Sequence, residues 1–421
     1  MSVRNQFISA HAVDARWFLA LKAIKRPLLL RSLAIDSAVL AQEKEKVFTT
    51  ASYSPVFTYP RLAADEVRTA LDQLLKLQTQ VYQEEVDSSI RTLYTERLRE
   101  LILEQELLLA SITEVWDVFQ TKNQALYGAL HPTFVAEHLH TLQARYHIFE
   151  SFSVQETERT THPTPADFAL AQSLLVGPDI ILPDGVEYSS ESLVDAWNAE
   201  LEVVMPDWKV VVDTAVVHML VDHKRRTVRV PAGVLMKAKK MRKLFVHEIG
   251  THVYRREQGK RSRLQLLSIG LAGYQAAEEG IALMRAQLTS NRFYHFGGLD
   301  KYLVLALATG ALDGVPKDFA ETFHLLEQYY AARLERVGKS ALIPRVAKTR
   351  AWNSTLRVFR GGNPSLPGCC FLRDKIYHEG NRAMWQLLQT HPEYFTSLLL
   401  GKYNPQDMTQ RTAVEVFRPV E

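Results

Sequence analysis

The first part of the chain alternates apolar and polar positions with the period of an α-helix. The stretches Leu62 to Val81 and Val86 to Val118 both follow this pattern, and the second carries leucines three and four residues apart. Because such leucine stripes almost always face a core, they predict helices that pack as a bundle and have no chemical role. His138 and His140 are two residues apart and face different ways on a helix, so we interpret them as surface or packing residues.

A polar segment rich in threonine and proline, from Gln155 to Ala166, follows this region and is typical of a linker. We therefore expect a helical N-terminal region over residues 1–155 and a second domain over residues 166–421.

The second region mixes strands with helices. Trp208 to Asp213 and Thr227 to Pro231 have the composition of short strands. Lys301 to Thr309 and Asp318 to Val337 have a helical pattern, and Asp318 is a suitable N-cap for the latter. Together with the helical first part, this order predicts the α+β fold class.

Composition is that of a protein with a large buried core. The chain has 421 residues, 47% of them apolar, which is more than one simple domain usually holds, so we expect two lobes. The formal net charge of +3 is small for this length and gives no reason to expect a nucleic-acid partner. The basic run Lys237 to Lys243 is best interpreted as a solvated helix face, with attraction of an acidic substrate as the alternative.

Cysteine usage and hydropathy favour the cytoplasm. The two cysteines, Cys369 and Cys370, are adjacent, and neighbouring cysteines rarely form a disulfide with each other without strain. No segment reaches the ~18 consecutive apolar residues that a membrane span needs, and the N-terminus lacks a signal-peptide pattern. We expect a cytoplasmic protein without a membrane span.

The most informative motif is the run from His247 to His252, which reads His-Glu-Ile-Gly-Thr-His. Two imidazoles that bracket a carboxylate are the groups that a metallopeptidase needs. Neutral histidine nitrogens hold Zn²⁺, and an unligated glutamate, here Glu248, deprotonates the water molecule that attacks the substrate. A structural zinc site usually has four Cys or His ligands, and no such set is visible, which favours a catalytic site.

The spacing of these histidines requires an unusual helix. Residues five apart on an ideal α-helix point about 140° apart, too far for both side chains to reach one ion. The motif therefore predicts a locally under-wound helix, most simply a π-bulge. Gly250 lies inside this turn, and a residue without a Cβ atom tolerates an altered backbone.

The third ligand is expected from the next helix, where Glu278 and Glu279 stand in a run of small and apolar residues. Adjacent helical residues point about 100° apart, so only one of the two faces the metal. The other glutamate either holds a metal-binding side chain in place by a hydrogen bond or is solvated. Periodicity does not show which of the two glutamates faces the metal.

Short strands followed by a metal-binding helix predict a zincin-like core. In such enzymes an exposed strand edge near the metal holds an extended peptide by main-chain hydrogen bonds. We expect one of the two strands, 208–213 or 227–231, to have this role.

The segment from Arg357 to Gly380 contains several glycines, prolines and arginines and predicts a loop. Because a guanidinium binds a carboxylate through two hydrogen bonds, Arg357, Arg360 and Arg373 are candidates to bind a C-terminal carboxylate. The alternative is that they brace the loop against acidic helices. Tyr377 is a candidate hydrogen-bond donor to the oxyanion that develops during hydrolysis.

These motifs together resemble a family of His-Glu-x-x-x-His metallopeptidases that includes the microtubule-associated tyrosine carboxypeptidases, whose bacterial members carry the label flavohaemoglobin expression-modulating QEGLA-motif proteins. The resemblance rests on His247 to Arg255, Gln265 to Leu267, Glu279 to Ala282, and the flanking elements Ser54 to Tyr59, Ala125 to Gly128, Arg357 to Gly362 and Arg373 to Gly380. The chain departs from the family at Ile281, where leucine is usual, and at Glu257 to Gly259, where many relatives have Asn-Gly.

The resemblance implies that His247, His252 and Glu279 bind one Zn²⁺ per chain and that Glu248 is the catalytic base. It implies a zinc carboxypeptidase that removes residues from the C-terminus of a peptide or protein. Two alternatives stay open: an endopeptidase or aminopeptidase with the same site, and a regulatory protein whose metal is structural. The presence of Glu248 argues against the second, since a structural site needs no free carboxylate. The motifs do not define the oligomeric state or the preferred side chain.

Overall fold

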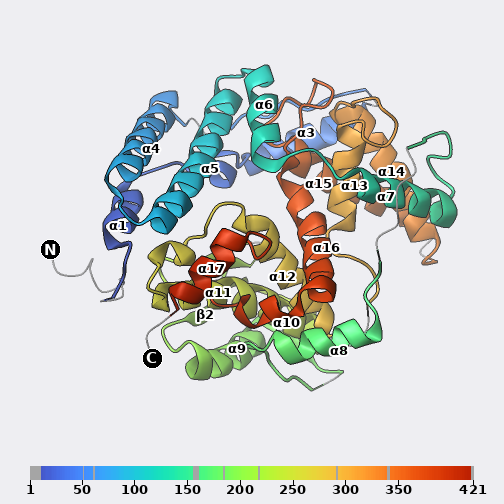
Figure 1. Cartoon of the computed structure of the whole chain (residues 1–421). Coiled ribbons are helices and arrows are strands. Elements are labelled where there is room, and N and C mark those ends of the chain that lie inside the picture. Colours follow the sequence, from blue (N-terminus) through green and yellow to red (C-terminus); the bar gives the residue numbers. More distant parts are fainter. Residues whose placement is uncertain are drawn as a thin grey trace.

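The computed structural model describes residues 11–50, 52–59, 62–154, 161–183, 185–216, 219–290, 293–338 and 342–418. Helices dominate it, and short strands are confined to the middle of the chain, so the fold is mixed α+β and mostly helical. In Figure 1 the N-terminal helices lie in one layer together with the helices between residues 299 and 359, and the helices of the middle of the chain form the other, with α16 running between them.

The N-terminal helices form two groups. They are α1 (Ala15–Ala23), α2 (Leu29–Ser32), α3 (Ser37–Thr49), α4 (Ala64–Glu84), α5 (Ser88–Ile112), α6 (Trp116–Tyr127) and α7 (Pro132–Tyr146). Helices α1, α2 and α6 contact the antiparallel pair α4 and α5, whereas α3 and α7 pack against the helices between residues 299 and 359. The two predicted amphipathic helices are confirmed as α4 and α5, and their apolar stripes are buried. The predicted end of the second at Val118 is wrong, because Glu114 adopts a positive φ of 57° and breaks the helix before α6.

The middle of the chain carries two small sheets between α8 (Pro165–Leu174), α9 (Ser190–Val204) and the helices that follow. Both predicted strands are confirmed, as β2 (Lys209–Asp213) and β4 (Thr227–Pro231). They are parallel, and β3 (Leu220–Asp222) pairs antiparallel with β4, giving the order β2-β4-β3. Because β4 is central, it offers no free edge. A second sheet pairs β1 (Glu187–Ser189) with β5 (Leu235–Lys237).

The remaining chain is helical. Its elements are α10 (Ala238–Leu244), the π-helix η1 (Phe245–Val253), α11 (Tyr254–Arg261), η2 (Gln265–Ser268), α12 (Tyr274–Leu288), α13 (Leu299–Ala308), α14 (Phe319–Glu335), α15 (Ile343–Phe359), η3 (Leu372–Asp374), α16 (Lys375–Thr390), η4 (Pro392–Ser397) and α17 (Met408–Val416). The predicted helices α13 and α14 are confirmed, and Asp318 caps α14 in a reciprocal capping box with Glu321.

The predicted loop from Arg357 to Gly380 is wrong at both ends. Arg357 lies in the last turn of α15, and Tyr377 lies in the first turn of α16. Glycine and proline do interrupt the helical structure, but only between α15 and α16. The segment is therefore a short connection between two helices.

Apolar cores join segments that are far apart in sequence. One contains Val47 and Val135 together with much of α13, α14 and α15. Another contains leucines of α4 and α5 together with Leu264, Leu266 and Tyr403. The N-terminal helices therefore pack directly on α13, α14 and α15 and on the segments around Leu264 and Tyr403.

Several other predictions concern packing. His138 is buried and contacts the rings of Tyr302 and His378, as expected of a packing residue, and Cys369 and Cys370 are buried free thiols.

Within the described ranges no helix has the length and apolar character needed to cross a membrane. Residues 155–160 of the expected linker lie outside the described residues, and helix α8 begins within its last part. The division into regions 1–155 and 166–421 and the cytoplasmic location stay predictions.

Candidate metal centre

Helix η1 presents both histidines of the motif to one cavity. The predicted local under-winding is confirmed and extends over nine residues, because the whole of η1 is a π-helix. Its apolar side chains pack with α9 and the β2-β4-β3 sheet in one core. On the opposite face the rings of His247 and His252 lie 5.0 Å apart between centroids and are nearly perpendicular. Burial, together with His252 nearby, lowers the pKa of His247 to about 4, so its imidazole is neutral at pH 7.

Helix α12 brings the third donor to the histidines. A Cβ atom on Gly280 would come within 2.2 Å of the Gly380 carbonyl oxygen, and one on Gly380 within 2.0 Å of the Ala276 carbonyl oxygen. Two glycines therefore allow α12 and α16 to pack backbone against backbone. This close packing fixes the position of α12 and of Glu279 on it.

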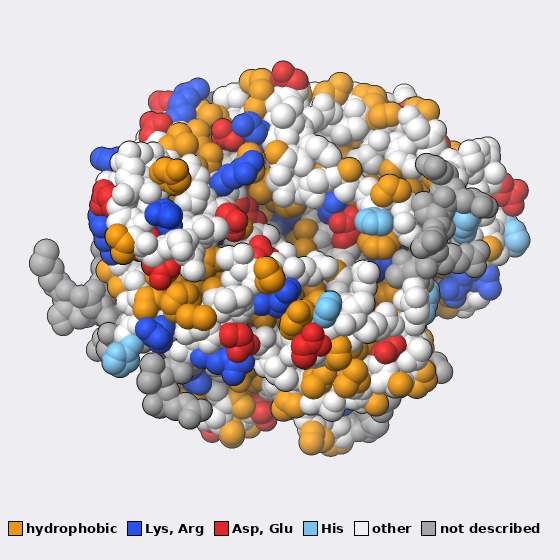
Figure 2. Space-filling view, viewed as in Figure 1, with side chains coloured by type: hydrophobic (Ala, Val, Ile, Leu, Met, Phe, Trp, Pro, Cys, Tyr) orange, Lys and Arg blue, Asp and Glu red, His pale blue; other side chains and the backbone are white. Residues whose placement is uncertain are grey.

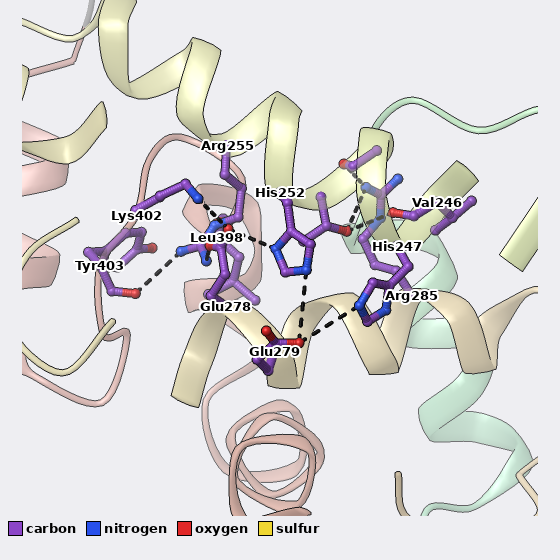
Figure 3. A network of polar contacts seen from close by, with 12 residues as sticks. Val246, His247, His252, Arg255, Glu278, Glu279, Arg285, Leu398, Lys402 and Tyr403 are labelled. Atoms are coloured by element: carbon purple, nitrogen blue, oxygen red, sulfur yellow. Dashed lines mark hydrogen bonds and ion pairs between the residues drawn. The ribbon is translucent and has the colours of Figure 1, made fainter. Parts of the chain in front are cut away.

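The donor atoms of His247, His252 and Glu279 converge (Figure 3). Glu279 Oε2 lies 3.7 Å from His247 Nε2 and 3.9 Å from His252 Nε2, and the three donors lie within 4.8 Å of one another. Donors bound tetrahedrally to one zinc ion lie about 3.4 Å apart. Two imidazole nitrogens and one carboxylate oxygen at this spacing fit such an ion, with room for a further ligand.

Glu278 points away from the other donors and supports His252 (Figure 3). Its carboxylate accepts a hydrogen bond from Arg255, lies 2.8 Å from Lys402 Nζ and lies 3.0 Å from His252 Nδ1. Burial alone would raise the pKa of Glu278, but Lys402, Arg255 and His252 outweigh burial and hold it well below its usual range. An ionised Glu278 accepts a hydrogen bond from His252 Nδ1–H, so the other ring nitrogen, Nε2, carries no proton and faces Glu279. Sequence periodicity left the roles of the two glutamates open, and the geometry separates them.

The three donors lie in a cavity of about 900 Å³ between the two layers. Figure 2 shows the corresponding hollow near the centre of one face of the molecule. Glu248, next to His247, lines the cavity, as do Leu220 and Val221 of the edge strand β3. The N-terminal part of the chain contributes Arg26, residues 28–31, Arg97, Glu104 and Tyr127.

The predicted residues of the C-terminal segment divide into two groups. Arg373 and Tyr377 line the cavity with the three donors, whereas Arg357 and Arg360 do not. Arg357 bonds Asp374 through Nε and Nη2 and donates to the Tyr377 hydroxyl over 3.3 Å, so it braces this segment. Arg360 has a buried Nε atom without a hydrogen-bond partner among the described residues. Neither is placed to bind a ligand in the cavity.

The guanidinium of Arg373 forms no hydrogen bond or ion pair within the described part of the chain, although the carboxylates of Glu279 and Asp374 lie near enough to act on its charge. Tyr377 is mostly buried. Burial and the nearby Glu279 raise its pKa, although Arg373 and Arg357 act in the opposite direction, so its hydroxyl stays protonated and can donate.

Many cavity residues were missed in the sequence, among them the charged residues Lys301 and Glu104. Lys301 on α13 places Nζ 3.0 Å from the centre of the Tyr377 ring, and burial, with Arg357 nearby, lowers its pKa to about 8. Glu104 lies on α5, where burial raises its pKa against the effect of Arg97. A single lysine at a helix start and a single acid in a leucine-rich helix carry no local signal, because only the tertiary packing brings them to the cavity.

Comparisons with known proteins support one family. A search of curated proteins and a search of solved structures each gave no match. The model of the family described as microtubule-associated tyrosine carboxypeptidase matches residues 46–414, which include every donor and every cavity residue from Glu104 to Lys402. The chain therefore belongs to the microtubule-associated tyrosine carboxypeptidase family.

Proposed function

We propose that the protein is a zinc-dependent carboxypeptidase with a zincin-like catalytic core. The observation that carries the proposal is the guanidinium of Arg373, which has no hydrogen bond or ion pair among the described residues and lies in the same cavity as the donors of His247, His252 and Glu279. A cation without a partner beside a hydrolytic centre suits a substrate with a free carboxylate. An endopeptidase has no such requirement, because its substrate continues on both sides of the cleaved bond.

In this proposal His247, His252 and Glu279 hold one zinc ion per chain. When bound, zinc acts as a Lewis acid that polarises the peptide carbonyl and makes a water molecule acidic enough to be deprotonated near neutral pH. Glu278, Arg255 and Lys402 keep His252 in the tautomer that binds through Nε2.

The chain's own groups carry the proton transfers. Glu248 takes the proton of the attacking water and passes it to the leaving amine, which requires that its carboxylate stay off the metal. The Tyr377 hydroxyl donates a hydrogen bond to the oxygen that gains negative charge. Since burial keeps Tyr377 protonated, this donor is available across the neutral pH range.

Arg373 binds the substrate's C-terminal carboxylate through two hydrogen bonds, and Lys301 adds positive charge beside it. The free edge of β3, at Leu220 and Val221, pairs with the peptide main chain. This role was expected of β2 or β4, but β4 is paired on both sides, and β3 is the edge strand that lines the cavity.

The proposal is tested by elemental analysis of the purified protein and of Glu248→Gln, together with cleavage of a peptide library read by mass spectrometry. Peptides with a C-terminal tyrosine come first, because the family description names this residue. We expect about one zinc per chain in both proteins, and trimming of free but not amidated C-termini by the unaltered protein alone.

Other outcomes separate the alternatives. Internal cuts in amidated peptides would make the protein an endopeptidase. Zinc without cleavage of any peptide would favour the regulatory protein, and a zinc-free protein would overturn the proposal.

A further inference from the structure

The π-helix η1 leaves one carbonyl outside its backbone ladder. Tyr254 N–H bonds the Ile249 carbonyl, five residues back, and also the Thr251 carbonyl, three residues back. The following helix α11 is an α-helix, in which an N–H regularly bonds the carbonyl four residues back, as Ser262 N–H bonds that of Gln258. The next N–H, that of Arg255, therefore has Thr251 as its regular acceptor. The Gly250 carbonyl between these two acceptors is passed over. A buried carbonyl needs another hydrogen-bond donor.

Arg285 supplies that donor (Figure 3). This buried arginine lies on α12, and its Nη1 donates to the Gly250 carbonyl oxygen and lies 3.4 Å from Thr251 Oγ1. Its Nη2 donates to the Pro178 carbonyl over 3.0 Å. Thr251 in turn donates its hydroxyl to the Val246 carbonyl over 2.9 Å, five residues back along the same π-turn. The guanidinium thus binds the under-wound turn from outside.

Gly250 is required by this arrangement in a way that differs from the predicted one. Its φ is not positive, so the backbone angle itself does not demand glycine. A Cβ atom there would lie 2.5 Å from the Pro178 carbonyl oxygen and 3.0 Å from Arg285 Nη1. The missing side chain makes space for the guanidinium and for the Pro178 carbonyl.

We propose that Arg285 is a positioning residue for the metal centre: by holding the Gly250 carbonyl, it keeps η1 in its π register and thereby keeps His247 and His252 on one face. Without the under-winding, residues five apart point about 140° apart, and both imidazoles no longer reach the same ion. Helix α12 carries both Glu279 and Arg285, so the same element delivers the third donor and sets the spacing of the other two. This role rests on the proposed zinc site.

The test uses the full chain as Arg285→Met and Arg285→Lys. Lys317→Met serves as a matched control, because Lys317 is also a buried cation bonded to two carboxylate oxygens and a carbonyl but does not line the cavity. The readouts are the zinc dissociation constant, from competition with a chromophoric chelator, and the visible absorption spectrum of the cobalt(II) form, which reports ligand geometry.

We expect Arg285→Met to bind zinc at least tenfold more weakly than the unaltered protein and to change the cobalt spectrum, with partial recovery in Arg285→Lys. Lys317→Met should lower thermal stability without either effect. If Arg285→Met does not fold, Gly250→Ala, whose methyl group crowds both the Pro178 carbonyl and the guanidinium, is measured in its place with the same expectation.

Zinc binding within twofold of the unaltered protein with the same cobalt spectrum would overturn the role of Arg285. So would an equal loss of affinity in Lys317→Met, which would make the effect one of general stability. Absence of zinc from the unaltered protein would instead reject the proposed function, so the two failures are distinguishable.

Discussion

Arg373 and Arg360 are thirteen residues apart and look alike in the sequence, yet they have different surroundings. Arg373 lines the cavity, and its guanidinium has no bonded partner in the described ranges, whereas Arg360 lies outside the cavity lining. Since the Arg360 guanidinium also has no bonded partner among these residues, the two arginines are distinguished by their position relative to the cavity, and residue type alone does not reveal this.

Replacing Arg373 with Met should raise KM for peptides with a free C-terminus. Hydrogen bonds to charged groups contribute about 1.5–3 kcal/mol, which corresponds to roughly 10- to 150-fold in KM. Steady-state kinetics on free and amidated peptides checks this. Arg360→Met is the control and should leave KM within about twofold; equal effects of the two substitutions would contradict the assignment.

Lys301 should make substrate binding depend on pH. Burial, with Arg357 and Arg373 nearby, lowers its pKa to about 8, while Asp374 and Glu279 act in the opposite direction. The ammonium is therefore charged below pH 8 and loses its charge as the pH rises through that value. KM for a free C-terminus should rise across this range, and Lys301→Met should raise KM at pH 7 and flatten the rise. An unchanged profile in Lys301→Met would assign the titration to another group.

At the scale of elements, the contact between α12 and α16 sets the position of Glu279. Gly380→Ala should destabilise the protein by about 1–3 kcal/mol, because the new methyl group overlaps the Ala276 carbonyl and the two helices must separate. Urea unfolding measures the loss. Gln386→Ala, on the exposed face of α16, is the control and should stay within about 0.5 kcal/mol. If Gly380→Ala left the free energy of unfolding unchanged, the two helices would adjust to the methyl group without a loss of stability.

The elements differ in how far local sequence predicts them. Strong periodicity predicts α4, α5 and α14, and the five-residue spacing of two histidines predicts the under-wound turn, because each pattern reflects contacts within a single element. The short strand β3 and the extents of α15 and α16 were not predicted, since the glycines and prolines between Arg357 and Tyr377 favoured a loop even though α16 itself has a clear helical pattern. Lys301 and Glu104 reach the cavity only through packing between distant segments.

At the scale of the whole molecule, the metal and the fold should stabilise each other. The three donors come from η1 and α12, so an ion that binds them favours the folded state. At a free zinc concentration 100 times the Kd, the gain is about 2.7 kcal/mol. Thermal unfolding with and without a chelator should show a lower Tm after zinc removal. His252→Ala should unfold at the same temperature in both conditions; a chelator effect that persists in this variant would place the stabilising metal elsewhere.

The support of His252 depends on Lys402 and on the Tyr403 carbonyl that binds Arg255, both far along the chain from the histidine. During synthesis on the ribosome, the segment from 247 to 279 emerges long before this support exists. The nascent chain therefore carries His247, His252 and Glu279 before the contacts that hold Glu278 and Arg255 beside His252 can form, and this support is completed only when the segment with Lys402 and Tyr403 docks.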